Sequence, residues 1–250
     1  MSALLVVPLA TVATVATVSV GYLLTVLAAA AARRPARPAR PGDPPRVAVV
    51  IPAHDEELVL AQTLESLRAQ THPAERFHVV VVADNCTDAT ARIARDAGAI
   101  VLERHDPRLR GKGFALAWAF ERLLGPHSPL PGGPADAFAV LDADTWADPE
   151  CVARLAAALP DDPEALAAVQ GRYGVLNPGS GWRAALMTAA FELCNHVKLR
   201  GLDRLGCSVG LKGNGMIFTR GTIVRVPWTG RSVTEDIDYG LDLLSDHGVR

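Results

Sequence analysis

From Arg46 onward, apolar and polar positions alternate in a pattern that predicts repeated strand–helix units. Short apolar runs at residues 47–51, 78–82, 100–102 and 137–141 predict buried strands. The stretches between them place apolar residues at helical spacing, as Leu60, Leu64 and Leu67 do after the first run. Alternation of this kind is typical of an α/β domain with a mainly parallel sheet.

The remaining pattern predicts further helices and two more extended segments. Helices are expected over residues 58–70, 87–97, 149–159, 182–199 and 233–245, with another that ends near Leu123, and strands near 167–171 and 213–219. Gly98 and Gly248 follow two of these helices, where glycine commonly ends a helix. The Pro/Gly-rich residues 125–134 predict a surface loop.

The first 32 residues break with this pattern. Residues 3–32 carry no charge, and at about 1.5 Å per residue they exceed the roughly 30 Å of a bilayer core. A cleaved secretory signal would need a positive start and a shorter apolar run, so residues 1–32 are predicted to be a single transmembrane anchor. Ala13, Thr17 and Gly21 form a small-residue stripe that could pack against a partner transmembrane helix.

A basic, proline-rich linker over residues 33–45 follows the anchor. Its run from Arg33 to Pro41 contains four arginines and predicts a semi-rigid polyproline stalk. The positive-inside rule places this side of the membrane in the cytoplasm. The expected arrangement is a single-pass protein of the cell membrane with a cytoplasmic catalytic domain at residues 46–250.

The composition and net charge of the chain limit the classes of partner that it can bind. The chain has 250 residues, of which 49% are hydrophobic and 21% charged, which suffices for a full core. The formal net charge of −2 leaves no basic excess for a phosphate backbone, so no nucleic-acid partner is expected. The four cysteines show no metal-type spacing and are interpreted as free thiols in a reducing compartment.

Acidic residues follow three of the predicted strands. Asp55 to Glu57 come after the first, Asp84 after the second, and Asp142 with Asp144 after the fourth. Ligands of open parallel sheets bind beyond the carboxyl ends of the strands, so these acids should converge on one site. So many carboxylates would repel one another unless a hard cation or hydrogen-bond donors intervened.

The Asp142-Ala143-Asp144 triplet is the predicted metal site. Alternate residues leaving a strand point the same way, so both carboxylates can share one cation whose other positions take phosphate oxygens. One alternative is a solvated turn in which an Asp caps the next helix. Another is a phosphatase of the haloacid dehalogenase class with Asp142 as nucleophile, but such enzymes place Thr or Val two residues after the second Asp, where this chain has Trp146.

Three further positions have both a functional and a purely structural interpretation. Asp84 could bind a base or ribose, or could belong to a helix-capping turn. Lys112, between two glycines at a helix start, suits phosphate, although Gly-Lys-Gly is a frequent sequence. Asp236 could act as a general base towards an acceptor hydroxyl, but acids in a first helical turn more often complement the helix dipole.

Taken in order, five motifs resemble those of the family 2 glycosyltransferases with the GT-A fold, a Rossmann-like nucleotide-diphospho-sugar transferase architecture. The segment 49–57 is similar to the opening strand and nucleotide-contacting loop, with Pro52, His54 and Glu56, and the segment 82–88 to the base-binding strand end. Residues 142–144 resemble the metal-binding DxD motif. Gly213-Asn214-Gly215 resembles the glycine turn on the acceptor side, and Thr234-Glu235-Asp236 the TED box of membrane-linked synthases.

The resemblance implies a role for each of these residues. Asp84 would contact uracil or ribose, Lys112 the diphosphate, Asp142 the nucleotide and the metal, and Asp144 the metal, which would be Mg²⁺ or Mn²⁺. Asp236 would deprotonate the acceptor. The chain is therefore expected to be an inverting hexosyltransferase that uses a UDP-sugar donor and a lipid-linked or polysaccharide acceptor at the cytoplasmic membrane face.

One departure from the family pattern leaves a second hypothesis open. Members with a TED box usually continue to a Gln-x-x-Arg-Trp element and further transmembrane helices, and this sequence ends at Arg250 before them. The domain at residues 46–250 is therefore expected to be truncated at its C-terminus. The alternative to an enzyme is a truncated, catalytically incomplete, membrane-tethered module that binds nucleotide sugar.

Overall fold

A computed structural model of the protein describes residues 3–32, 43–230 and 234–249. The chain divides into two compact units. One contains the N-terminal helix and residues 172–209, and the other contains the sheet and its covering helices, from residues 38–171 and 210–250. The predicted domain at residues 46–250 includes residues 172–209, which in the structure group with the N-terminal helix. The proposed linear boundaries stay a prediction.

The larger unit is built on a six-stranded sheet with the order β3-β2-β1-β4-β6-β5. The strands are β1 (Val47–Ala53), β2 (Phe77–Asp84), β3 (Ile100–Arg104), β4 (Ala137–Val140), β5 (Ala168–Gln170) and β6 (Met216–Thr219). β1 pairs in parallel with β2 and β4, and β2 with β3, while β6 runs antiparallel to β4 and β5. The predicted mainly parallel α/β sheet is confirmed.

Helices cover both faces of this sheet because its central strands are apolar on both sides. In β1, Val47, Val49 and Ile51 face one layer, and Ala48 with Val50 face the other. All five are almost completely buried. Continuous apolar runs of this kind are what a parallel strand covered on both faces requires. The period-2 geometry of a strand thus divides the core into two clusters.

The covering helices are short, and most lie where the sequence places them. The larger unit contains α2 (Leu60–Arg68), η1 (Ala74–Arg76), α3 (Thr90–Asp96), α4 (Lys112–Leu124), α5 (Cys151–Ala158), α8 (Arg220–Arg225) and α9 (Glu235–Ser245). Leu60, Leu64 and Leu67 of α2 pack in one cluster, and Leu116, Phe120 and Leu123 of α4 in the other. The predicted start at Val233 lies outside the described residues.

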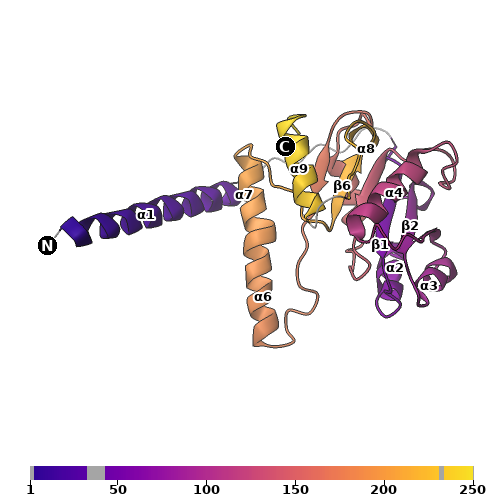
Figure 1. Ribbon diagram of the computed structural model, residues 1–250, viewed down its shortest axis with the longest axis horizontal. Helices are drawn as coiled ribbons and strands as arrows, with labels where there is room; N and C mark the ends of the chain where they lie inside the picture. Colours follow the sequence, from indigo (N-terminus) through magenta and orange to yellow (C-terminus); the bar gives the residue numbers. More distant parts are fainter. Residues whose placement is uncertain (1–2, 33–42, 231–233, 250) are drawn as a thin grey trace. The chain divides into compact units, whose positions relative to one another are not determined.

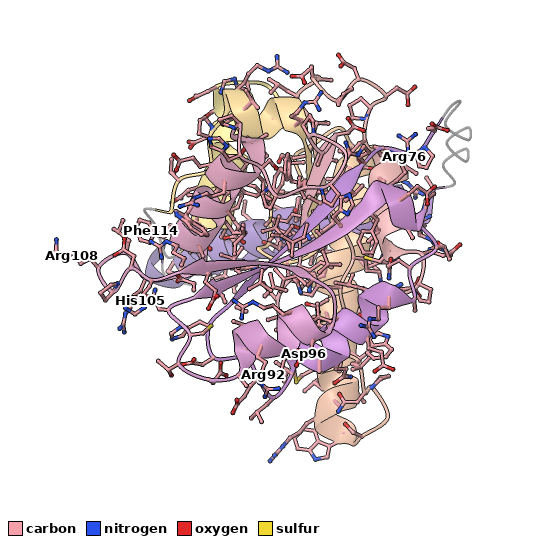
Figure 2. The ribbon with its side chains drawn as sticks, turned by 90° about the vertical axis from the view of Figure 1, so that its right-hand side faces the viewer. Arg76, Arg92, Asp96, His105, Arg108 and Phe114 are labelled. Atoms are coloured by element: carbon pink, nitrogen blue, oxygen red, sulfur yellow. The ribbon has the colours of Figure 1, made fainter. Side chains whose placement is uncertain are left out.

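Figure 2 shows the two edges of this layered arrangement. His105, Arg108 and Phe114 lie at one end, beyond the carboxyl end of β3, whereas Arg76, which precedes β2, lies at the opposite end. Arg92 and Asp96 lie on α3, below the sheet in this view, and form an ion pair at 3.4 Å. The loops that leave the carboxyl ends of β1, β2 and β4 therefore belong to the edge that His105 marks.

The smaller unit contains α1 (Ala3–Ala31), α6 (Trp182–Glu192), the π-helical turn η2 (Leu193–Val197) and α7 (Lys198–Arg204) (Figure 1). The single helix predicted over residues 182–199 is thus a continuous rod that contains a π segment and extends to Arg204. Within α1, residues Val7–Ala31 are long and apolar enough to cross a membrane.

The contact between α1 and α7 is close and local. Among the described side chains of α1, only Val26 and Ala30 are buried. A Cβ atom on Gly201 would overlap the carbonyl oxygen of Val26, so glycine permits this approach. Arg204 donates hydrogen bonds to the carbonyl oxygens of Ala29 and Ala30, which lie in the last turn of α1.

An aromatic cluster attaches α9 to the sheet. Tyr239 lies 5.6 Å from Phe218 of β6 and 4.6 Å from Trp228, measured between ring centroids. Its hydroxyl donates a 2.6 Å hydrogen bond to the carbonyl oxygen of Val226. Burial of the ring raises the pKa of the Tyr239 hydroxyl well above its usual range. This packing fixes the helix whose first turn carries Glu235 and Asp236.

Replacing Tyr239 with Phe should therefore destabilise the larger unit. The change leaves the buried Val226 carbonyl without its donor, which costs about 1–3 kcal/mol. Because folding raises the Tyr239 pKa, its contribution is complete below the unfolded value of 10.0 and is lost as pH rises above it. As the pH rises above 10.0, the unfolding free energy of the wild type should therefore fall more than that of Tyr239→Phe. Chemical denaturation in detergent measures both values.

Tyr22→Phe provides the matched control, because that tyrosine is exposed on α1. Its unfolding free energy should stay within about 0.5 kcal/mol of the wild type. Equal stability of Tyr239→Phe and the wild type at neutral pH would show that the hydroxyl contributes nothing.

Candidate active site

A cleft of about 360 Å³ opens at the carboxyl edge of the sheet. Its walls come from the ends of β1, β2 and β4 and from the start of α4. The lining residues are Pro52, Ala53, His54, Glu56, Asp84, Asn85, Arg110, Gly111, Lys112, Ala115, Asp142, Ala143 and Asp144. The acids that follow three separate strands thus meet at one site, as expected for an open parallel sheet.

The Asp142-Ala143-Asp144 segment keeps the alternation of the strand it follows. Ala143 is buried in the core, whereas Asp142 is half-buried and Asp144 is exposed. The hydroxyl of Thr63, on α2, donates a 2.6 Å hydrogen bond to the Ala143 carbonyl oxygen. This hydrogen bond and the burial of Ala143 fix the middle of the segment in the core, so both carboxylates lie on the cleft side.

Asn214 braces the same segment from the other side. Its side-chain oxygen accepts a hydrogen bond from the Asp142 backbone N–H at 3.1 Å, and its amide donates to the Thr145 hydroxyl at 2.9 Å. Gly213 and Gly215 both adopt positive φ angles, 74° and 68°, which favour glycine and turn Asn214 towards Asp142. The glycine turn predicted to line the acceptor side thus also positions the acidic segment.

Lys112 links the acidic segment to the glycine turn. Its ammonium group donates to the Asp142 carboxylate and to the Gly213 carbonyl oxygen, and the lysine and Asp142 form an ion pair. Lys112 is half-buried at the first position of α4. The cation that was predicted to contact a diphosphate therefore lies directly beside the predicted metal ligands.

Asp84 is held by a buried ion pair that the sequence pattern did not reveal. Arg104 donates to Oδ1 of Asp84 at 2.6 Å, and both side chains are buried. The Asn85 amide donates to the same oxygen at 3.0 Å. Among the described residues these side-chain bonds go to Oδ1, which leaves Oδ2 to accept from a ligand in the cleft. The bottom of the cleft thus offers a fixed acceptor.

His54 and Glu56 form the β1 side of the cleft. The Nδ1 atom of His54 lies 2.7 Å from the Asp84 carbonyl oxygen, so Nδ1–H donates there and Nε2 remains free of this bond. Burial raises the pKa of the Glu56 carboxyl, and the negative charge of Asp144 raises it further. The carboxylates of Glu56 and Asp144, which follow β1 and β4, therefore repel each other.

Asp236 and Glu235 lie at the border of this site without lining the cleft. A Cβ atom on Gly213 would lie 3.3 Å from Oδ2 of Asp236 and 3.5 Å from Nζ of Lys112. Glu235 instead packs over Gly113, where a Cβ atom would lie 3.1 Å from its Cγ. Asp236 is thus placed near the glycine turn, and Glu235 against the start of α4.

The residues of the cleft fit a divalent cation at Asp142 and Asp144. Hard cations prefer carboxylate oxygens, and Asp144 is an exposed carboxylate with no ion pair in the described part of the chain. Of the carboxylates that line the cleft, Lys112 pairs with Asp142 and Arg104 with Asp84, while Arg104 also pairs with Asp106 outside the cleft lining. Negative charge at Asp144 and Glu56 remains for a cation to neutralise.

A second group of possible ligands, Asp55, Cys86 and Asp88, is better explained as a structural joint. Its ligand atoms lie within 4.8 Å of one another. However, Asp55 accepts hydrogen bonds from the backbone N–H groups of Thr87 and Asp88, and Asp88 accepts from that of Glu57. Burial raises the pKa of the Cys86 thiol, which opposes the thiolate that a metal would need. These bonds join the loops after β1 and β2.

The sequence pattern missed the residues that support the site. Arg104, Asn85 and Arg110 were not singled out, although Arg104 pairs in register with Asp84 at the ends of β3 and β2. That register, a cation beside an acid on neighbouring strand ends, is the signal that would have identified it. Gln170 was also missed. Its amide donates to the Asn214 carbonyl oxygen at 2.7 Å and so secures the glycine turn.

Comparison with known proteins agrees with this arrangement. The family model described as glycosyl transferase family 2 matches residues 48–221, more than half of the chain. The hexosyltransferase Agl6 of low-salt glycan biosynthesis in Haloferax volcanii is 41% identical over 83 residues, which are 33% of this chain and 19% of that protein. The probable glycosyltransferase YdaM of Bacillus subtilis is 32% identical over 139 residues, covering 53% and 30%.

The hyaluronan synthase of Streptococcus pyogenes is 32% identical over 124 residues, which are 47% of this chain and 27% of that protein. The matched segments thus span less than a third of the length of these three curated relatives. Two of these relatives are named as a hexosyltransferase and a glycosyltransferase, and the third as a hyaluronan synthase.

Solved structures confirm the GT-A fold. The mannosyltransferase of Pyrobaculum calidifontis in complex with GDP-Man and Mn²⁺ superimposes with a TM-score of 0.63 at 18% identity, covering 92% of this chain and 61% of that one. Glucosyl-3-phosphoglycerate synthase of Mycobacterium tuberculosis, in complex with Mn²⁺, UDP and glucosyl-3-phosphoglycerate, gives 0.54 at 21% identity, covering 82% and 67%. The phosphatase interpretation of Asp142 is set aside by these matches. The chain belongs to glycosyl transferase family 2.

Proposed function

We propose that the protein transfers a hexose from a UDP-sugar, with inversion, to a lipid-linked or polysaccharide acceptor at the cytoplasmic face of the membrane. The observation that carries this proposal is the convergence of Asp84, Asp142, Asp144 and Lys112 on one cleft, with Asp236 at its border. Nucleotide-diphospho-sugars carry a base, a ribose and a diphosphate, and the cleft offers a group suited to each part.

The nucleoside end of the donor would lie at the β2 side of the cleft. Asp84 lines the cleft, and its Oδ2 could accept a hydrogen bond from an N–H of the base or an O–H of the ribose while Arg104 holds Oδ1. A buried carboxylate whose other oxygen is already paired is held in one orientation. Asp84 therefore selects a ligand group that donates.

The diphosphate would lie between Lys112 and the two aspartates. Asp142 and Asp144 would hold Mg²⁺ or Mn²⁺, which when bound neutralises charge on the departing diphosphate. The Lys112 ammonium could also contact this diphosphate, since it already contacts Asp142. It can move from the carboxylate to a phosphate oxygen as the donor binds. Two structural neighbours contain Mn²⁺ with a nucleotide, which supports this assignment.

Transfer would proceed by a single displacement. The acceptor hydroxyl oxygen forms a bond to the anomeric carbon while the bond from that carbon to the diphosphate oxygen breaks. The Asp236 carboxylate takes the hydroxyl proton, and UDP leaves with the bonding electron pair. Attack from the face opposite the leaving group inverts the anomeric centre. The position of Asp236 beside Gly213 supports its role as the base.

The apolar helix α1 supports a membrane location for this reaction. Residues Val7–Ala31 form a candidate span, and four arginines follow at residues 33–40. By the positive-inside rule these arginines support a cytoplasmic location for the larger unit, which would give it access to membrane-bound acceptors. The similarity to a hyaluronan synthase is consistent with a glycan or lipid-linked acceptor.

Removing the Asp144 carboxylate should weaken nucleotide binding that depends on metal. In calorimetric titration with UDP and Mn²⁺, Asp144→Ala should bind UDP at least about tenfold more weakly than the wild type, or roughly 1.4 kcal/mol. Without metal the two should differ little. Glu150→Ala, which removes an exposed acid outside the cleft, should bind as the wild type does. Equal UDP affinity in Asp144→Ala and the wild type would refute the metal role.

Lys112→Met should discriminate UDP from UMP. Because the ammonium is assigned to the diphosphate, the variant should lose about fivefold or more in UDP affinity, roughly 1 kcal/mol, and little in UMP affinity. Arg108→Met is the matched control, since Arg108 belongs to the loop that precedes α4 and lies at the periphery of the larger unit (Figure 2). A parallel loss for both nucleotides would assign Lys112 to support of Asp142 instead.

Asp236→Asn should retain donor binding and lose transfer. The amide cannot accept the proton, so incorporation of labelled sugar from a panel of UDP-sugars into membrane lipid and polymer should fall by about 10²-fold or more. Asp238→Asn changes an exposed acid two residues further along α9 and should keep the wild-type rate. An Asp236→Asn rate equal to that of the wild type would remove this residue as the base.

A further inference from the structure

The first turn of α4 and the segment that leads into α9 meet where two glycine backbones touch. Gly113 follows Lys112 at the start of α4, Gly230 precedes α9, and both glycines are buried. A Cβ atom on Gly230 would lie 2.3 Å from the backbone nitrogen of Phe114 and 2.5 Å from the carbonyl carbon of Gly113. A Cβ atom on Gly113 would lie 2.8 Å from Cα of Gly230. Gly113 and Gly230, together the glycine contact, therefore have no room for a side chain unless a backbone moves.

Space, and not backbone conformation, explains glycine at both positions. Among the described glycines, neither Gly113 nor Gly230 has a positive φ angle, whereas Gly213 has one of 74°. Alanine also forms helices more readily than glycine does, so the formation of α4 does not explain Gly113. What these two residues provide is therefore the close approach of two backbones.

The glycine contact lies between the two ends of the proposed reaction. Lys112, assigned to the diphosphate, is the neighbour of Gly113 in α4, and Asp236, assigned as the base, lies in the first turn of α9. Cγ of Glu235 packs over Gly113, where an added Cβ atom would lie 3.1 Å away. At Gly213 an added Cβ atom would lie 3.3 Å from Oδ2 of Asp236 and 3.5 Å from Nζ of Lys112. The ammonium group and the base thus share one tightly packed junction.

α9 has a second attachment, one helical turn further along. The Tyr239 ring lies 4.6 Å from that of Trp228, which in turn lies 6.2 Å from the Phe120 ring of α4. Residues four apart lie on one face of a helix, so the face of Glu235 and Tyr239 is held at both the glycine contact and the aromatic cluster. A side chain added at the glycine contact therefore displaces the first turn of α9, while the cluster keeps the helix on the sheet.

We propose that Gly113 and Gly230 are positioning residues, whose backbone contact sets the separation between the Asp236 base and the Lys112 ammonium. The proposal rests on the proposed function and adds a determinant of its geometry. In an inverting displacement the acceptor oxygen and the leaving diphosphate lie on opposite sides of the anomeric carbon. The base must therefore stand at a fixed distance from the diphosphate site, and a misplacement of about 1 Å can cost about 10²-fold in rate.

Gly230→Ala in the full chain tests the positioning role. Its affinity for UDP with Mn²⁺ in detergent should stay within about twofold of the wild type, because the donor groups of the cleft are unchanged. Incorporation of labelled sugar from the panel of UDP-sugars should fall by at least about tenfold. Gly179→Ala is the matched control, since an added Cβ atom there meets nothing within 4 Å and its φ angle is not positive. It should keep the wild-type rate.

A longer base separates positioning from damage to the fold. Asp236→Glu should lower the transfer rate in the wild-type background and raise it in the Gly230→Ala background, because the longer side chain recovers the reach that a displaced helix has lost. Where Gly230→Ala binds no UDP, Gly113→Ala, whose added Cβ atom has the longer contacts, takes its place in the same comparison. A glycine variant with the wild-type rate, or one that Asp236→Glu does not improve, would overturn the proposal.

Failure of the proposed function gives a different result. A wild-type chain that incorporates sugar from no donor in the panel refutes the transfer, and this inference with it. A wild type that transfers sugar beside glycine variants that transfer equally well refutes the positioning role alone.

Discussion

Repulsion among carboxylates at the carboxyl edge of the sheet is the constraint around which this site is organised. Glu56, Asp84, Asp142 and Asp144 come from three strand ends and face one cleft. The fold offsets two of these charges itself, through Arg104 and Lys112. The charge that remains at Asp144 and Glu56, where burial and Asp144 raise the Glu56 pKa, favours a site that is completed by a cation and its phosphate ligand.

The supports of the site have different physical origins. Asp84 is rigid because its ion pair with Arg104 is buried, and breaking one partner of such a pair leaves an uncompensated charge. Lys112 is more accessible and is held by a carboxylate and a carbonyl oxygen that a diphosphate can replace. Asn214 orients the acidic segment through its backbone. Asp84 is thus held in a fixed orientation, whereas the groups that hold Lys112 could be replaced by the diphosphate that we propose to bind there.

The sequence predicted the elements whose signals are local. The apolar runs of β1, β2 and β4 and the acids after them defined the sheet and its edge, because strand period and strand polarity are encoded within a few residues. The Arg104 partner of Asp84, the Asn214 brace and the grouping of residues 172–209 with α1 could not be predicted in this way. Each depends on contacts between residues distant in sequence, which only the folded arrangement brings together.

We propose that Asp142 and Asp144, and not another acidic group, hold the cation that binds the donor diphosphate. Crystals of the protein grown with UDP and Mn²⁺, measured at the manganese absorption edge, locate that cation directly. We expect an anomalous difference peak bonded to the Asp144 carboxylate, on the cleft side of Asp142 and in contact with the diphosphate. A peak among Asp55, Cys86 and Asp88, or UDP bound in the cleft without manganese, would contradict it.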